Sequence, residues 1–376
     1  MALQQLMTRL RRPLSRSKMG VIGIDLSLQH LHMVQFKKCG DGSLELHAQV
    51  SISYPGSREE LLSSPEALKK VLSRAFSGGK FDGRSVVLGM PGGRFRTVSV
   101  NYKLHGHESD DQVIARMMAE RLDGDVSDYV MDYIPVRAEA RDAEKLAIVA
   151  LSKRNDVTAF LDSMAKAGLD VKALEISPVA IRRLAATLPG AKSDLVLILN
   201  TGVKKSYLTM LSGRRLLMDQ SVEFSESRML ATVANTLDIS EESALRMLQR
   251  TGLHPASDEL SRDHREGETG ICNTLLEILK PEFQKLVEET DRAFMYASAQ
   301  ARGGGDARIL LFGSLARLRG ADHVLSRLTR LPVTILPNPL QSFGEIENGE
   351  RSGDAVSEPE FAFATGLALR GLVDDE

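Results

Sequence analysis

Two short polar segments, each at the end of an apolar strand, carry residue types that can bind phosphate groups and a magnesium ion. The first offers a carboxylate, a hydroxyl and an amide, in the order Asp25, Ser27 and Gln29. The second offers an amide, a hydroxyl and a glycine, in the order Asn200, Thr201 and Gly202. A carboxylate in such a turn can hold Mg²⁺ or a water bound to it, while turn N–H groups face phosphate oxygens. Either segment alone is an ordinary turn, so the pair predicts the phosphate site, with Asp25 as the metal ligand.

A third segment follows a buried strand near the end of the chain and contains Gly313, Ser314 and Leu315. A glycine at this point lets a flat ligand approach the backbone. We expect a helix to start directly after it, and a helix N-terminus favours anions. The segment therefore predicts a third part of the same ligand site.

Composition and charge narrow the function classes. The 376 residues are 43% hydrophobic and 26% charged, as in a soluble globular protein, and are enough for two domains. A net charge of −2 argues against nucleic acid as a partner, because neutralising phosphates needs a basic excess. Cys39 and Cys272 are far apart and predict buried thiols rather than a metal site. No apolar run approaches the roughly 20 residues of a transmembrane helix.

The N-terminal segment 1–18 is basic and lacks the apolar stretch of a secretory signal. It is interpreted as a flexible leader, or as a short amphipathic helix that touches an anionic membrane surface.

Apolar patterning predicts an α/β protein made of two similar halves. Strands at 21–26, 31–36 and 44–52 form a meander, followed by a helix at 59–76 and a strand at 85–90. The meander pattern returns at 194–200, 206–211 and 216–222, which suggests two halves that face one cleft. The first half comprises 19–94 and 170–193, and the second 194–372, with a helical subdomain at 225–300.

A different pattern fills residues 95–169. Strand, helix, strand, strand and helix are expected at 96–102, 110–122, 129–136, 145–151 and 155–167. This order predicts a small βαββα subdomain inserted into the first half.

The remaining elements belong to the second half. Helices are expected at 227–237, 240–251, 275–300 and 361–372, with strands at 308–312 and 333–336. Pro281 is expected to interrupt the third of these helices, because proline suits a first helical position. Residues 373–376 form a tail.

Several passages resemble the family of the type IV pilus assembly protein PilM, within the superfamily of actin and hexokinase. Residues 21–27 are similar to the family's opening G-I-D-x-S, and residues 289–296 match its E-I-x-R-S-L-x-Y helix. Residues 312–316, 331–333 and 337–339 look like its G-G-(G/S)-A run leading to P-V and N-P. Residues 364–372 are similar to the C-terminal A-x-G-L-A-L-R-G, the most specific passage. Together the resemblance covers Met19 to Leu372.

The resemblance implies an actin-like, ribonuclease H-like fold with duplicated domains around a nucleotide cleft, and ATP and Mg²⁺ as ligands. It also implies a cytoplasmic protein at the inner face of the inner membrane. Its partners would be the cytoplasmic tail of a bitopic, PilN-like membrane protein and other pilus assembly proteins. The tail would bind in a groove beside the inserted subdomain, between the first half's sheet and the helix at 110–122.

Three departures from the family bear on its chemistry. Asn200 stands where the second phosphate loop usually begins with an acid, so a ligand for magnesium-bound water is lost. Residues 26–28 hold no glycine where the wider superfamily places one, and the helix at 240–251 lacks the lysine that the family often has near the nucleotide base. Glu289 is retained and could bind a ribose hydroxyl. We therefore expect nucleotide binding without efficient hydrolysis. Two alternatives stay open: a genuine ATPase or filament-forming motor, and a nucleotide-free component of an MSHA-type pilus or type II secretion system.

Overall fold

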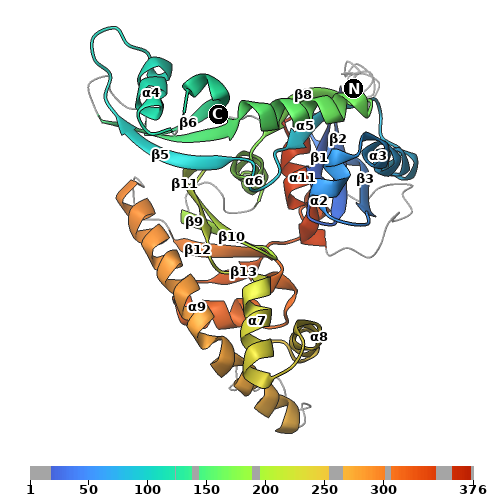
Figure 1. Cartoon of the computed structure of the whole chain (residues 1–376), viewed down its shortest axis with the longest axis vertical. Helices are drawn as coiled ribbons and strands as arrows, with labels where there is room; N and C mark the ends of the chain where they lie inside the picture. The colour runs from blue at the N-terminus through green and yellow to red at the C-terminus, as the bar shows by residue number, and fades with distance from the viewer. Residues whose placement is uncertain are drawn as a thin grey trace, which may run out of the picture. The chain divides into compact units, whose positions relative to one another are not determined.

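The computed structural model describes residues 18–122, 124–137, 144–188, 195–253, 266–300, 306–343 and 358–373. The chain divides into two compact units, which are drawn in Figure 1. The first unit comprises Met1–Arg94, Asn155–Leu184 and Asn338–Glu376, and the second comprises Phe95–Arg154 and Ala185–Pro337. Two parts of the predicted organisation lie outside the described residues: the leader up to residue 17 and residues 374–376 of the tail.

The first unit contains a five-stranded sheet that confirms the predicted meander. Its strands are β1 (Lys18–Leu26), β2 (His30–Lys38), β3 (Leu44–Ser53), β4 (Ser85–Gly89) and β8 (Asp170–Glu175). They lie in the order β3-β2-β1-β4-β8, with β1 antiparallel to β2 and parallel to β4. Successive side chains of a strand point to opposite faces, so Ile22 and Ile24 share one face, and Gly23 and Asp25 share the other.

The second unit repeats this topology. Its strands are β9 (Leu195–Thr201), β10 (Ser206–Ser212), β11 (Arg215–Val222), β12 (Ala307–Gly313) and β13 (Val333–Ile335). Their order is β11-β10-β9-β12-β13, again with an antiparallel meander followed by parallel strands. The two sheets therefore confirm the predicted duplication.

The helices of the first unit are α2 (Arg58–Ser63), α3 (Pro65–Gly79), α5 (Arg154–Lys166), α6 (Ser177–Ala185) and α11 (Ala362–Ala368), with 3₁₀ turns η3 (Gln341–Phe343) and η4 (Glu358–Phe361). The single helix predicted at 59–76 is wrong, because Ser64 caps a new helix whose first residue is Pro65. Helix α11 is shorter than predicted. It contacts β1, β2 and β4, and its apolar residues join Val34 and Phe36 in one core.

The inserted subdomain has the predicted element order. It contains β5 (Arg96–Tyr102), α4 (Asp110–Ala119), the 3₁₀ turn η1 (Val126–Asp128), β6 (Tyr129–Arg137) and β7 (Lys145–Lys153), and α5 follows. The three strands form an antiparallel sheet in the order β5-β7-β6, and α4 packs its apolar side on it. Residues 95–154 belong to the second unit, where β5 and β6 contact β11.

The other helices of the second unit are α7 (Glu226–Leu237), α8 (Glu241–Thr251), α9 (Glu266–Gln300) and α10 (Ala321–Thr329), with the 3₁₀ turn η2 (Leu315–Arg317). Helix α9 contacts α7, α8, α10, β10 and β11. The predicted interruption at Pro281 is wrong, because this residue lies inside one continuous helix. In the described part of the chain, no helix is both long enough and apolar enough to cross a membrane.

Candidate functional site

The first predicted loop lies at the end of β1, in the first unit. Asp25 lies opposite His32 of β2 in the register of the two antiparallel strands. The Ser27 hydroxyl donates to the His30 carbonyl over 3.0 Å and accepts from the His30 N–H over 3.1 Å. Gln29 is exposed, and its carbonyl accepts from the Tyr54 N–H. The Ser27 hydroxyl therefore holds the β1–β2 turn together, while the Gln29 side chain is accessible to a ligand.

Burial and one nearby cation determine the pKa of Asp25. Burial raises the pKa of the Asp25 carboxyl to about 6, and the Arg58 guanidinium opposes this rise. Burial also raises the pKa of the Tyr54 phenol, which donates to the Ser27 carbonyl over 2.5 Å. The residue types around Asp25 are thus a cation and a neutral phenol.

The second and third predicted segments lie together in the second unit, where β9 runs parallel to β12. The Thr201 hydroxyl donates to the Phe312 carbonyl over 3.0 Å and accepts from the Leu315 N–H over 2.9 Å. The Thr201 carbonyl accepts from the Ser314 N–H over 2.7 Å and from the Ser314 hydroxyl over 3.1 Å. The two segments therefore satisfy each other's polar groups, and this use of Thr201 was not predicted from the sequence.

Glycine is required in both segments for close backbone approach. Gly313 has a φ of +92°, and a Cβ there would lie 2.1 Å from the Thr201 carbonyl oxygen. A Cβ on Gly202 would lie 2.3 Å from the Lys205 carbonyl oxygen. The Gly202 carbonyl accepts from the Glu226 N–H at the start of α7. Both glycines thus bring protein backbone together, and Asn200 Oδ1 lies close to Gly313, 3.0 Å from the position that a Cβ would take there.

The helix expected directly after Gly313 is absent. The 3₁₀ turn η2 stands there, and α10 begins only at Ala321, after Gly320. The chain leaves the helical conformation at Leu318, whose backbone is extended, and Gly320 has a φ of +80° directly before α10. The Leu315 N–H donates to the Thr201 hydroxyl, so it is not free to bind an anion.

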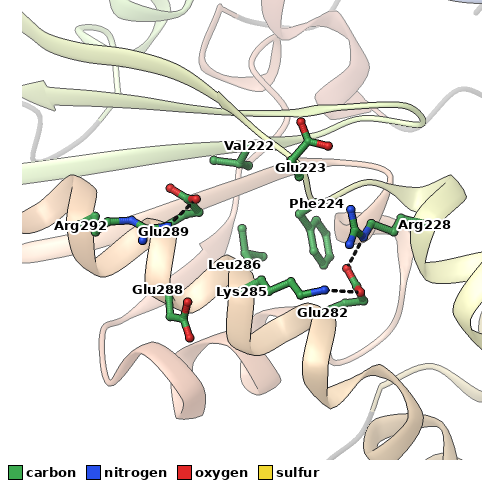
Figure 2. A pocket seen from close by; sticks show the side chains of 10 residues that line it. All are labelled: Val222, Glu223, Phe224, Arg228, Glu282, Lys285, Leu286, Glu288, Glu289 and Arg292. Carbon is green, nitrogen blue, oxygen red and sulfur yellow. Dashed lines mark hydrogen bonds and ion pairs between the residues drawn. The ribbon is translucent and has the colours of Figure 1, made fainter.

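Glu289 lies on α9 in a pocket of about 270 Å³, shown in Figure 2. Three of the lining residues are apolar, namely Val222, Phe224 and Leu286. The other lining side chains are charged: Glu223, Arg228, Glu282, Lys285, Glu288, Glu289 and Arg292. Glu289 pairs with Arg292 over 2.5 Å. The described residues that line this pocket include none of the three loop segments.

The carboxylate of Glu282, which is buried in this pocket, forms ion pairs with two neighbouring cations. Arg228 Nε lies 2.7 Å from one oxygen of Glu282, and Lys285 Nζ lies 3.1 Å from the other. Both ion pairs are visible in Figure 2.

The residues present fit ATP and Mg²⁺ only in part. Asn200, Gln29 and the exposed Lys204 and Lys205 are available to phosphate oxygens, whereas the polar groups of Thr201, Ser314 and Leu315 are used within the fold. Asp25 as a magnesium ligand stays a prediction, and one observation counts against it, since the charged group that acts on Asp25 is a cation. Across the described ranges, no three His, Cys, Asp or Glu side chains gather as a metal site.

Comparison with known proteins gives one family and several similar folds. The family model described as type IV pilus assembly protein PilM matches residues 23–372. Among curated protein sequences, none matches the chain. A chain of a solved PilM-PilN type IV pilus biogenesis complex is 19% identical, with a TM-score of 0.68, over 94% of this chain and 99% of that one. This likeness, with the duplicated sheets, identifies the fold as actin-like.

Two further solved structures are similar at lower scores. The ethanolamine utilization protein EutJ from Carboxydothermus hydrogenoformans is 12% identical, with a TM-score of 0.49, over 98% of this chain and 95% of that one. MreB5 of Spiroplasma citri, bound to ADP, is 12% identical, with a TM-score of 0.47, over 88% of this chain and 94% of that one.

Proposed function

The chain belongs to the family of the type IV pilus assembly protein PilM, and from this premise we propose that it is a nucleotide-binding scaffold that binds a membrane protein's cytoplasmic tail. The observation that carries the proposal is the family match over residues 23–372, which spans both units. An actin-like fold with both units present supplies the framework that a nucleotide scaffold needs. It does not by itself imply hydrolysis.

Three observations favour a scaffold over an efficient ATPase. The second loop begins with the amide of Asn200 rather than with a carboxylate that could orient an attacking water. The hydroxyl of Thr201 and the N–H of Leu315 bond to each other. Asp25 has a cation, Arg58, in its electrostatic environment. Since phosphoryl transfer depends on positioned charges, each departure should lower turnover by orders of magnitude.

The proposed partner is the short cytoplasmic tail of a bitopic, PilN-like inner-membrane protein. The similar solved structure is that of a complex between PilM and PilN, which supports this choice of partner. Binding to such a tail would hold this chain in the cytoplasm at the inner face of the inner membrane, where it would meet other pilus assembly proteins.

We place the tail-binding surface on the inserted subdomain, at helix α4. One side of α4 packs in the subdomain core through Val113, Ile114 and Met118, so the other side is exposed to solvent. Arg116 lies on this exposed side and pairs with Glu108 over 2.8 Å. A helix supported on one side by a sheet is a rigid surface for a peptide.

Titration of a synthetic peptide of the tail, followed by fluorescence anisotropy, tests the partner half of the proposal. Arg116→Glu should weaken binding of the peptide by about tenfold, because it reverses the charge of a side chain on the proposed surface and leaves Glu108 without its ion-pair partner. The matched control is Arg246→Glu on α8, where Arg246 is likewise exposed and paired with a glutamate. Equal affinity of both variants and the unchanged chain would remove α4 from the surface. A lack of binding by the unchanged chain would reject the partner.

Thermal denaturation with and without ATP, together with phosphate release, tests the nucleotide half. A higher melting temperature without phosphate release supports the scaffold. Steady release that Asp25→Ala abolishes would instead establish an ATPase. No shift with any nucleotide would favour a nucleotide-free component of an MSHA-type pilus or type II secretion system, an alternative favoured by the internal use of Thr201, Ser314 and Leu315.

A further inference from the structure

The pocket beside α9 in Figure 2 has apolar lining residues that the core of the second unit holds in place. Val222, Phe224 and Leu286 are each at most 5% exposed. The ring of Phe224 also lies 5.9 Å from that of Phe283, a buried residue of α9. The volume of about 270 Å³ is below the roughly 300–1,000 Å³ of sites for drug-sized ligands, so the pocket suits a side chain better than a nucleotide.

The three cations among the described residues that line the pocket are all paired with carboxylates. Glu282, whose side chain is 10% exposed, pairs with Arg228 over 2.7 Å and with Lys285 over 3.1 Å. Arg292 pairs with Glu289 over 2.5 Å. An anionic ligand would have to break these pairs, and it would leave the buried carboxylate of Glu282 without a partner, which is costly. These cations therefore do not form an anion site.

Two acids of the pocket have no such partner. The side chains of Glu223 and Glu288 form no hydrogen bond or ion pair within the part of the chain that the structure describes. Glu223 directly follows β11, Glu288 lies on α9, and Figure 2 shows them on either side of Leu286. The uncompensated charge of the pocket is therefore negative and surrounds an apolar residue. A cation on an aliphatic stem complements this arrangement.

The surface next to the pocket carries an exposed apolar side chain. Met295 lies three residues beyond Arg292 on α9, so the two are neighbours on the helix surface. Its exposed fraction of 74% is the highest of any large apolar side chain among the described residues, and the next, that of Ile271, is 46%. Methionine adapts its shape to different partners and is enriched at protein interfaces. We therefore expect one protein partner to cover both Met295 and the pocket.

We propose that this pocket binds an arginine side chain from a basic segment of another protein, with an apolar residue of that segment against Met295. The guanidinium would lie between Glu223 and Glu288, and its aliphatic stem would pack on Leu286. Arginine fits better than lysine, because its planar guanidinium can donate to two carboxylates at once. This surface is separate from the one proposed for the membrane protein's tail on α4, and the inference does not depend on nucleotide binding.

Fluorescence anisotropy with three short labelled peptides tests the proposal on the full chain. The peptides contain glycine, serine and leucine around one central residue, which is arginine, citrulline or glutamate. The arginine peptide should bind about tenfold more tightly than the citrulline peptide, which has the same shape without the charge, and the glutamate peptide should not bind. Equal Kd values for the arginine and citrulline peptides, or no binding of the arginine peptide, would overturn the inference.

Variants of the two unpaired acids test where the arginine binds. Glu223→Gln and Glu288→Gln should each reduce the preference for arginine over citrulline about threefold, and the double variant should abolish it. Both residues are exposed, so the variants should fold as the unchanged chain does. The matched control is Glu277→Gln, which removes an exposed carboxylate from α9 outside the pocket and should leave the preference unchanged. A control that lowers the preference as much as Glu288→Gln would reject the pocket.

Two further measurements test the apolar contact and the class of partner. Met295→Ser should weaken the arginine and citrulline peptides by the same factor, about twofold to threefold, because it removes an apolar contact and no charge. Unchanged affinity for both peptides would exclude Met295 from the surface. In sedimentation velocity, the unchanged chain and Glu288→Gln should sediment alike. Self-association of the unchanged chain that Glu288→Gln abolishes would assign the pocket to a second copy of this chain and overturn the inference.

Discussion

Asp219 lies on β11, where the sheet of the second unit contacts the inserted subdomain. Thr209 Oγ1 donates to one oxygen of its carboxylate over 2.8 Å, and Thr97 Oγ1, from β5, lies 3.4 Å from the other. Burial nevertheless raises the pKa of Asp219 from 3.8 to about 6, and the two hydrogen bonds only reduce this rise. The folded chain therefore binds this proton more tightly than the unfolded chain does.

From this shift we predict that the free energy of unfolding increases as the pH falls from 7 to 5. Above pH 6 the ionised carboxylate opposes folding, and between pH 6 and 4 the folded state takes up the proton first, which removes that penalty. The contribution is at most about 3 kcal/mol, at 1.36 kcal/mol for each pKa unit. Urea denaturation at several pH values measures it. Asp219→Asn should flatten this part of the profile, and a variant profile parallel to that of the unchanged chain would contradict the prediction.

At the level of elements, the docking of α11 on β1 explains why small residues occur at 364–372, the passage that most resembles the family. A Cβ on Gly23 would lie 2.1 Å from the Ala364 carbonyl oxygen, and a Cβ on Gly366 would lie 2.1 Å from that of Ala180 on α6. Beneath this helix, Arg183 forms a bidentate ion pair with Glu175, at 2.9 and 3.1 Å, and donates to the Gly366 carbonyl over 2.8 Å. Small residues and one buried ion pair thus hold α11 in place.

We predict that Gly23→Ala lowers the free energy of unfolding by about 1–3 kcal/mol or more, because the added methyl group meets backbone atoms that cannot rotate away. Chemical denaturation followed by circular dichroism measures the change. The matched control is Gly270→Ala on α9, where a Cβ meets nothing within 4 Å. This control should stabilise the chain by about 0.5–1 kcal/mol. Equal stabilities of the two variants would show that α11 does not lie against β1 at Gly23.

Local pattern was sufficient to predict the inserted subdomain and every strand of the two sheets except β8, because alternation and turn residues are properties of short segments. Local pattern was insufficient where contacts between residues far apart in the sequence determine the secondary structure. Pro281 continues inside α9 because Leu279, Phe283 and Leu286 around it are buried, so tertiary packing outweighs the missing hydrogen bond. The break between α2 and α3 did have a local signal, a serine N-cap followed by proline at 64–65.

For the candidate site, the sequence predicted that residues 200–202 and 313–315 act together, and the structure places them side by side. It could not predict that Thr201 uses the N–H of Leu315, since the two residues are more than a hundred positions apart. Arg58 was also missed as a neighbour of Asp25. The capping box at Ser57 and Glu60 indicates only where its helix starts, and only the fold shows which strand end it reaches.

For the molecule as a whole, each unit has its own five-stranded sheet, and the chain passes between the units at residues 94–95, 154–155, 184–185 and 337–338. We expect each unit to open locally according to its own contacts, as cooperative substructures of a protein do. A variant in one unit is therefore a probe of that unit.

Hydrogen exchange followed by mass spectrometry tests this expectation with two variants. Gly23→Ala should speed exchange in β1, β2, β4 and α11 of the first unit and leave β9 and β12 as they were. Thr201→Val should do the reverse, because it leaves the buried N–H of Leu315 without its acceptor, a loss of about 1–3 kcal/mol. If either variant speeds exchange equally in both sheets, the two units open together, and a nucleotide that binds either one would stabilise the whole chain.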